Sequence, residues 1–147
     1  MKNIFNILGA IVLAAMLSVA LSSCSNYQKL LKSTDYETKY TEAVKYYYAQ
    51  DYYRAYPLFE ELITIFKGKT KAEKTYYFYA YCQYGLGEYE LSAFHFDNFV
   101  RTFPNSEYAE ECMYMNAYCY YVDSPGYSLD QTNTAKAINE LMMKEKK

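Results

Sequence analysis

The stretch that decides the fold is Glu73–Pro104, EKTYYFYAYCQYGLGEYELSAFHFDNFVRTFP. Its first half places Tyr77, Ala80 and Tyr84 at spacings of three and four residues, which is typical of an α-helix. Its second half spaces aromatic residues in a near-helical pattern up to the closing proline, and Leu86-Gly87 separates the halves. The stretch therefore predicts two antiparallel helices. Because one such pair cannot bury both its faces, we expect a similar pair on each side.

The chain repeats itself at an interval of 37 residues. When the chain is aligned with itself at this interval, three positions of the first helices carry the same residue in every repeat, and we call each such set a column. The columns are Tyr40, Tyr77 and Tyr114; Ala43, Ala80 and Ala117; and Tyr47, Tyr84 and Tyr121. In the second helices, Phe59 aligns with Phe96, Leu62 with Phe99, and Phe66 with Phe103. We expect these six side chains to pack in the core. A fixed period of roughly 20–50 residues is the mark of a stacked solenoid. The expected fold is all-α, a right-handed solenoid of about three antiparallel helix pairs.

The pattern predicts helices at about 35–50, 52–67, 71–86, 88–103, 106–122 and 132–145. Thr34-x-x-Glu37 and Thr70-x-x-Glu73 match the capping box, so each is expected to start the first helix of a pair, and Asn105-Ser106 to start the third. Pro57 lies within the second helix and predicts a late start or a kink there. Asp130 or Thr132 is expected to cap the last helix, after a longer loop containing Pro125-Gly126.

Composition and charge exclude several classes of protein. The chain has 147 residues and 21 tyrosines, an aromatic content too high for a disordered chain. The net charge is −2, and no basic run is long enough to indicate nucleic-acid binding. The densest basic patch, Lys67, Lys69, Lys71 and Lys74, lies mostly in the loop between the first two pairs. A solvated loop is the simplest interpretation, and a docking point for an acidic partner or for anionic lipid headgroups is the alternative.

The N-terminus has the pattern of a secretion signal. Lys2 precedes an apolar run that ends in Leu21-Ser22-Ser23-Cys24, which resembles the lipobox of bacterial lipoproteins. We therefore expect residues 1–23 to be a signal peptide, Cys24 to carry the acyl chains (palmitate), and residues 24–33 to be a tether. The alternative is an uncleaved membrane anchor, for which the apolar run is short. Ser25 is not aspartate, which favours the outer membrane over retention at the inner one.

The sequence contains no recognisable catalytic or metal-binding set, so we expect neither an enzyme nor a cofactor. Gly68-Lys69-Thr70 lacks the earlier glycine and the strand of a phosphate-binding loop. His95 is the only histidine and lies beside an apolar helix position, where a structural role is expected. Cys82, Cys112 and Cys119 are expected to be small buried apolar residues, with one disulfide between neighbouring helices as the alternative.

A stripe of tyrosines along the first helices is the candidate site. Its members are Tyr40, Tyr47, Tyr77, Tyr81, Tyr84, Tyr114, Tyr118 and Tyr121. In a helix-pair solenoid the first helices line the concave side, and tyrosine suits contact with peptides because it combines an apolar ring with a hydroxyl group. Two interpretations stay open: the rings form a binding groove, or they fill the seams between stacked helices.

The repeat resembles the tetratricopeptide repeat. The small residue of its first helix corresponds to Ala43, Ala80 and Ala117, and its closing proline to Pro104, although the 37-residue spacing is three longer than the basic unit. Together with the lipobox, the segments FPNS-x-YAEE and LDQT make the whole chain resemble the BamD (ComL) family. The expected domain is a tetratricopeptide-repeat domain over 34–147, with repeats at about 36–70, 73–104 and 106–147.

The resemblance implies an outer-membrane lipoprotein on the periplasmic side, held in the membrane by its lipid anchor. Its implied partners are a BamA-like barrel subunit, other assembly-machinery lipoproteins and unfolded segments of outer-membrane proteins. Family members are usually longer, so we expect a C-terminally truncated chain whose last repeat is incomplete. A tetratricopeptide adaptor of cell-envelope maintenance, near the Tol-Pal system, is the alternative function. A cell-wall hydrolase is a third, but no nucleophile–base or metal set supports it.

Overall fold

The computed structural model describes residues 26–126 and 129–144, and side chains as far as residue 142. The chain divides into two units, Met1–Asp35 and Tyr36–Lys147. In the first unit, residues 26–31 are helical where the sequence suggested a simple tether. The expected signal peptide and the lipidated Cys24 lie outside the described residues, so both stay predictions.

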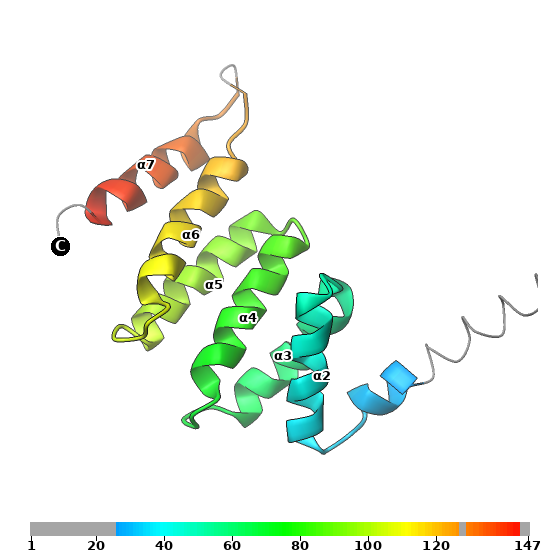
Figure 1. Ribbon diagram of the computed structural model, residues 1–147. Coiled ribbons are helices and arrows are strands. Elements are labelled where there is room, and N and C mark those ends of the chain that lie inside the picture. Colours follow the sequence, from blue (N-terminus) through cyan, green and yellow to red (C-terminus); the bar gives the residue numbers. More distant parts are fainter. Residues whose placement is uncertain (1–25, 127–128, 145–147) are drawn as a thin grey trace, which may run out of the picture. The chain divides into compact units, whose positions relative to one another are not determined.

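The second unit consists of three antiparallel helix pairs (Figure 1). Its helices are α2 (Tyr36–Tyr48), α3 (Tyr52–Ile65), α4 (Ala72–Gly85), α5 (Tyr89–Thr102), α6 (Ala109–Val122) and α7 (Thr132–Lys144). All six agree with the predicted ranges to within a few residues, and the described residues contain no strand. The all-α, tetratricopeptide-like architecture is therefore confirmed. The third pair contains both of its helices, and truncation stays a prediction.

The pairs stack because α3 and α5 each pack on both their own first helix and the first helix of the next pair. The ring of Phe59 on α3 lies 5.5 Å from that of Phe78 on α4, in a stacked arrangement. At the next junction the Asn116 side chain on α6 donates a 2.8 Å hydrogen bond to the backbone oxygen of Ala93 on α5. The first junction is thus packed by aromatic rings, and the second is also held by a buried side-chain hydrogen bond.

The core contains the columns expected from the repeat. Ala43 and Ala80 are fully buried and Ala117 is 1% exposed, so each first helix presents its small residue to a close neighbour. Among the aligned residues of the second helices and their ends, Phe59, Leu62, Phe66, Phe96 and Phe99 are also buried, whereas Phe103 is partly buried and packs against the core. The predicted core is therefore confirmed.

The helix starts differ from the predicted capping boxes. The cap position of α4 is Lys71, one residue after Thr70, and it makes no side-chain capping bond. The cap of α6 is Tyr108, and Ser106 instead accepts a hydrogen bond from the Tyr108 backbone N–H. Thr70 and Ser106 therefore do not cap α4 and α6, and both predictions were wrong.

Two other local predictions concern Pro57 in α3 and the start of α7. The helix α3 begins at Tyr52 and contains Pro57 in its interior, so a late start at this proline was wrong. Asp51 caps α3, because its carboxylate accepts from the backbone N–H of Arg54. Asp130 accepts hydrogen bonds from the backbone N–H and the hydroxyl of Thr132, the first residue of α7, and the cap of this helix stays a prediction.

The two short turns share one backbone geometry but use different residues. Gln50 has φ +58° and Gly87, one repeat later, has φ +82°. In both turns the next residue donates its N–H to the carbonyl five positions back: Asp51 to Tyr46 and Glu88 to Gln83. This is the Schellman ending of a helix, which favours glycine at the left-handed position. Gln50 therefore holds a conformation that costs a residue with a Cβ atom about 1–2 kcal/mol.

Replacing Gln50 by glycine is expected to raise the free energy of unfolding by about 1 kcal/mol, because the strain outweighs the greater freedom that glycine gives the unfolded chain. Urea unfolding followed by circular dichroism measures the change as a shift in midpoint at constant slope. The matched variant is Gly87→Gln, where a Cβ atom would meet nothing within 4 Å, so the conformational cost acts alone. An unchanged or lower midpoint for Gln50→Gly would contradict the assignment.

Candidate protein-binding surface

The structure divides the eight predicted tyrosines into two groups, and the first group fills the seams between helices. The ring of Tyr40 on α2 lies 5.9 Å from that of Phe66, which follows α3. The ring of Tyr47 lies 4.7 Å from that of Phe78 on α4. Burial raises the pKa of both hydroxyl groups, so both stay protonated at neutral pH. At these two positions the rings fill the seams between stacked helices, which was one of the two interpretations left open by the sequence.

Tyr77 and Tyr81, also in this first group, join the second pair to the third. Both hydroxyl groups on α4 donate to one carboxylate oxygen of Glu111 on α6, and the Tyr77 bond is 2.9 Å long. Burial, followed by the hydrogen bond to Glu111, raises the pKa of each tyrosine. The tyrosines therefore act as permanent donors at neutral pH. Sequence patterns gave no sign of this contact, because its partners are 30 and 34 residues apart.

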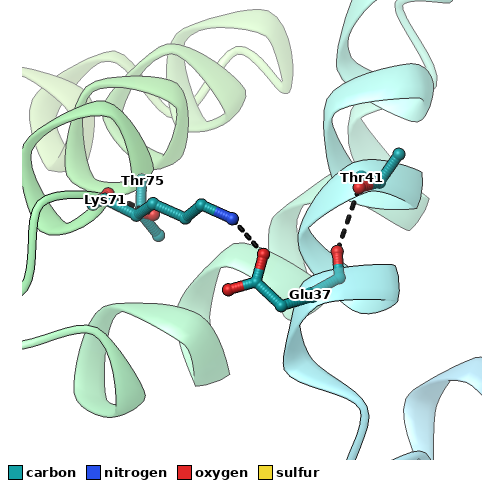
Figure 2. A network of polar contacts seen from close by, with 4 residues as sticks. All are labelled: Glu37, Thr41, Lys71 and Thr75. Carbon is teal, nitrogen blue, oxygen red and sulfur yellow. Dashed lines mark hydrogen bonds and ion pairs between the residues drawn. The ribbon is translucent and has the colours of Figure 1, made fainter.

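The acids at the starts of α2 and α4 also bond between repeats, in their case to the repeat that follows. Figure 2 shows Lys71, at the start of α4, reaching the carboxylate of Glu37 on α2. The Lys71 ammonium also lies 5.0 Å from the centre of the Tyr40 ring. At the next junction the Ser106 hydroxyl donates to Glu73. Glu37 and Glu73 are the acids of the two expected capping boxes, so the structure gives them a role between repeats.

Lys71 belongs to the basic patch that the sequence left open to two interpretations. Its ion pair with Glu37 lies within the protein and is partly exposed, with side chains that are 40% and 69% accessible. Exposed pairs of this kind contribute little to stability, about 0–1 kcal/mol. Lys71 is therefore neither a purely solvated residue nor a free docking point.

The second group of tyrosines forms an open aromatic surface on α6. We call Tyr114, Tyr118 and Tyr121 the α6 tyrosine ladder. The rings of Tyr114 and Tyr118 are stacked with centroids 5.7 Å apart, and those of Tyr118 and Tyr121 are 6.0 Å apart. Tyr84 extends the ladder onto α4, since its ring lies 6.3 Å from that of Tyr118. Tyr114 and Tyr121 are 47% and 67% exposed, so the ladder is available for contact.

A hollow elsewhere on the domain contains none of the eight predicted tyrosines. It measures about 570 Å³ and lies between the turns that follow α2 and α4, lined by residues 49–53, Gly85 and Leu86. A Cβ atom on Gly85 would lie 2.3 Å from the Tyr52 ring, so the close approach of these elements requires glycine. The hollow is thus separate from the aromatic surface on α6.

His95 has a packing role on α5. Its Nδ1 atom lies 3.3 Å from the Tyr76 hydroxyl, and its ring lies edge-on to Tyr79 at 4.7 Å. Burial lowers the pKa of its imidazole, which favours the neutral form. The structural role expected from the sequence agrees with these contacts. Within residues 26–126 and 129–144, no group of three or more His, Cys, Asp or Glu side chains is arranged to hold a metal ion.

Cys82, Cys112 and Cys119 are buried and not disulfide-bonded, as the apolar interpretation predicted. Burial raises their pKa values to about 12, 12 and 11 respectively. The Cys119 thiol also donates a 3.6 Å hydrogen bond to the Ser92 hydroxyl. The reactive thiolate form is therefore strongly disfavoured at neutral pH.

These three thiols are expected to resist alkylation in the folded protein, because they are both inaccessible and protonated. Treatment with iodoacetamide near pH 8, followed by peptide mass spectrometry, reports on each cysteine separately. In native protein labelling should be slow, and in urea all three should react within minutes. Fast labelling of any one of them in native protein would contradict its buried position.

The stacked helix pairs and their open aromatic surface define a helical-repeat scaffold of the tetratricopeptide type. The chain matches the family model YfiO, described as an outer membrane lipoprotein, over residues 32–143, and it belongs to this family. A comparison with curated proteins gave no match. The match confirms the expected class of outer-membrane lipoprotein. Among the described residues, no helix is both long enough and apolar enough to cross a membrane.

Proposed function

We propose that this protein is a scaffold lipoprotein of the β-barrel assembly machinery that faces the periplasm and acts by binding other proteins. The observation that carries the proposal is the α6 tyrosine ladder, an exposed aromatic surface on a repeat domain of an outer-membrane lipoprotein family. Its partners are a BamA-like barrel subunit, accompanying lipoproteins and unfolded segments of outer-membrane proteins. The resemblance of FPNS-x-YAEE and LDQT to the BamD family supports this choice of partners.

Tyrosine is well suited to such contacts. It offers a large apolar face at low entropic cost, and a few aromatic residues commonly dominate the energy of an interface. The ladder presents three such rings on one helix without gaps between them. By contrast, Tyr77 and Tyr81 already bond to Glu111 within the protein. We therefore place the binding surface on α6, at one end of the predicted stripe.

The experiment is retrieval of partners by the tagged full-length lipoprotein from detergent-solubilised outer membranes. The BamA-like subunit should be retrieved, and the joint change Tyr114→Ala and Tyr121→Ala should lower its yield about tenfold. Tyr53→Ala is the matched control, because Tyr53 is an 83% exposed tyrosine on a different helix, α3. Retrieval of Tol proteins without the barrel subunit would instead support the envelope-maintenance function.

The lipid anchor is proposed to be the thioether-linked lipid on Cys24, at the end of the apolar run. Two or three acyl chains hold a protein firmly, since each buried CH₂ contributes about 0.8 kcal/mol. Radiolabelled palmitate should label the natural protein, and Cys24→Ala should abolish both the label and membrane partitioning. A Cys24→Ala protein that still partitions into membranes would argue against this anchor.

A further inference from the structure

The helix α7 lies at the end of the stack and carries an open apolar side (Figure 1). Ile138, Leu141 and Met142 are 52%, 44% and 58% exposed. Residues three and four positions apart are neighbours on a helix surface, so these side chains form one stripe, which we call the α7 stripe. Ala137, beside the stripe, is buried, and α7 packs on α6. The helix therefore buries one side within its own pair and leaves the stripe open among the described residues.

A step from a small residue to a larger apolar one, four positions later, occurs in each of the three second helices. The steps are Ala55 to Phe59 in α3, Ser92 to Phe96 in α5, and Ala137 to Leu141 in α7. The small residue is buried in all three helices. The larger residue is fully buried in α3 and α5, but it is 44% exposed in α7. The step therefore identifies Leu141 as the counterpart of two core phenylalanines, from which it differs in lacking cover.

In α3 and α5 the larger residue of the step is covered by the first helix of the next pair. The ring of Phe59 stacks at 5.5 Å on that of Phe78 on α4. Phe96 lies in one buried cluster with Met115 of α6. No helix follows α7 within the described part of the chain. Leu141 thus occupies the position of a repeat junction without the helix that completes one.

Ile138, the residue directly after the small one, occupies a second junction position. Its counterpart in α3 is Tyr56, whose ring stacks at 5.3 Å on that of Tyr79 on α4. Its counterpart in α5 is Ala93, whose backbone oxygen accepts the hydrogen bond from Asn116 on α6. Two positions that contact the next first helix in α3 and α5 are therefore open and apolar in α7. Continuity with these two junctions indicates a helix as the occupant.

A second copy of the protein offers no matching helix at the other end of its stack. Phe78 and Tyr79 are the residues of α4 whose rings pack on α3. One repeat earlier, their counterparts on α2 are Thr41 and Glu42, and Glu42 forms an ion pair with Lys45 on the same helix. An apolar stripe that covered these groups would remove their water without replacing it. Pairing of α7 with itself would join two second helices, whereas both junctions place a first helix on a second one.

We propose that α7 receives an amphipathic helix of another protein, which packs on the α7 stripe as α4 packs on α3 and α6 packs on α5. The helix α6 shows the pattern that such an occupant needs, because it has buried residues at spacings of three, four and seven. They are Cys112, Met115, Asn116 and Cys119. The partner helix therefore carries uncharged, mainly apolar residues at these spacings and polar residues elsewhere. This contact goes beyond the proposed function, because it is made by α7 with a helical partner and does not involve the α6 tyrosine ladder.

The test measures the binding of fluorescein-labelled synthetic peptides to the full-length lipoprotein in detergent by fluorescence anisotropy. The first peptide has 14 residues, the length of α4 and α6, with leucine at positions i, i+3, i+4 and i+7 and with glutamate or lysine elsewhere. The second peptide has the same composition, with its leucines distributed around the helix. The first should bind about tenfold more tightly, because only it presents a continuous apolar face. Empty micelles measure the partition of each peptide into detergent, which is subtracted.

Variants assign the binding to α7. Ile138→Gln with Leu141→Gln should remove most of the preference for the first peptide, because the stripe loses two of its apolar side chains. The matched control is Leu91→Gln with Phe94→Gln, which changes two apolar residues, also three positions apart, on the second helix α5. Leu91 and Phe94 are 43% and 54% exposed, so the two pairs are similarly accessible. The control should leave the preference unchanged, and circular dichroism verifies that both variants keep their helical content, as expected for changes at exposed side chains.

Equal binding of the two peptides would overturn the inference, as would a preference that survives the changes at Ile138 and Leu141. An equal loss in the α5 control would also overturn it, because binding would then not depend on α7. Light scattering separates a second copy from a different partner: a dimer that the α7 changes convert to monomers would show that α7 pairs with itself, and would overturn the assignment to another protein. Failure of the proposed function is a separate result, because retrieval of the barrel subunit is tested through Tyr114 and Tyr121 on α6.

Discussion

Replacing Phe96 by alanine is expected to lower the free energy of unfolding by about 3–5 kcal/mol, a large part of the 5–15 kcal/mol typical of a domain. Phe96 is fully buried on α5, and its ring lies edge-on to Tyr81 at 4.9 Å. It belongs to a buried cluster with Ala80, Phe99 and Cys112. The substitution therefore removes apolar contacts and leaves a cavity at the junction between the second and third pairs.

Urea unfolding measured by far-ultraviolet circular dichroism checks this expectation. The matched control is Phe94→Ala, which removes the same ring two residues earlier on the same helix. Phe94 is 54% exposed, so its loss should change stability by no more than about 0.5 kcal/mol. Similar midpoints for the two variants would show that α5 does not bury the predicted face.

The second large effect is expected from Ala80→Leu, which should destabilise the protein by about 3 kcal/mol through overpacking. Ala80 is fully buried on α4, opposite Ser92 and Ala93 of α5, which are fully buried as well. The Ser92 hydroxyl donates a 3.0 Å hydrogen bond to the Ala80 backbone oxygen. Three extra carbon atoms at this position must push the two helices apart and strain that bond.

The control for overpacking is Ala135→Leu on α7, where the side chain is exposed. Its larger side chain can extend into solvent, so its effect should be within about 0.5 kcal/mol. The measurement is again the urea midpoint, together with the slope of the transition. A wild-type midpoint for Ala80→Leu would mean that α4 and α5 separate here without cost, contrary to the contact described.

Buried Lys39 shows a feature that the periodic pattern did not predict. Its side chain is fully buried on α2, and its Nζ atom lies 2.7 Å from a carboxylate oxygen of Glu61 on α3, which is 40% exposed. The lysine ammonium also lies 5.7 Å from the Tyr36 ring centre. A charged residue in a helical sequence normally indicates a solvated face. The approach of α3 supplies a carboxylate partner that makes this position tolerable.

From the sequence, the candidate site could be predicted only as a set of tyrosines, with no distinction between exposed and packed members. Tyr40, Tyr77 and Tyr114 occupy one column of the repeat, and the sequence treats them alike. In the structure Tyr40 packs on Phe66, Tyr77 donates to Glu111, and Tyr114 is 47% exposed. Their environments differ because α2 and α4 are each followed by another first helix, whereas none follows α6 within the described residues.

By itself, the sequence determined the helices, their pairing and the buried columns. Helical periodicity and the 37-residue repeat are local and regular, so they place alanine and phenylalanine in the core without knowledge of the neighbours. Only the tertiary structure decided which tyrosines stay open and which acids bond between repeats. Those outcomes depend on contacts between residues about thirty positions apart, such as Tyr81 and Glu111, and no local pattern encodes such distances.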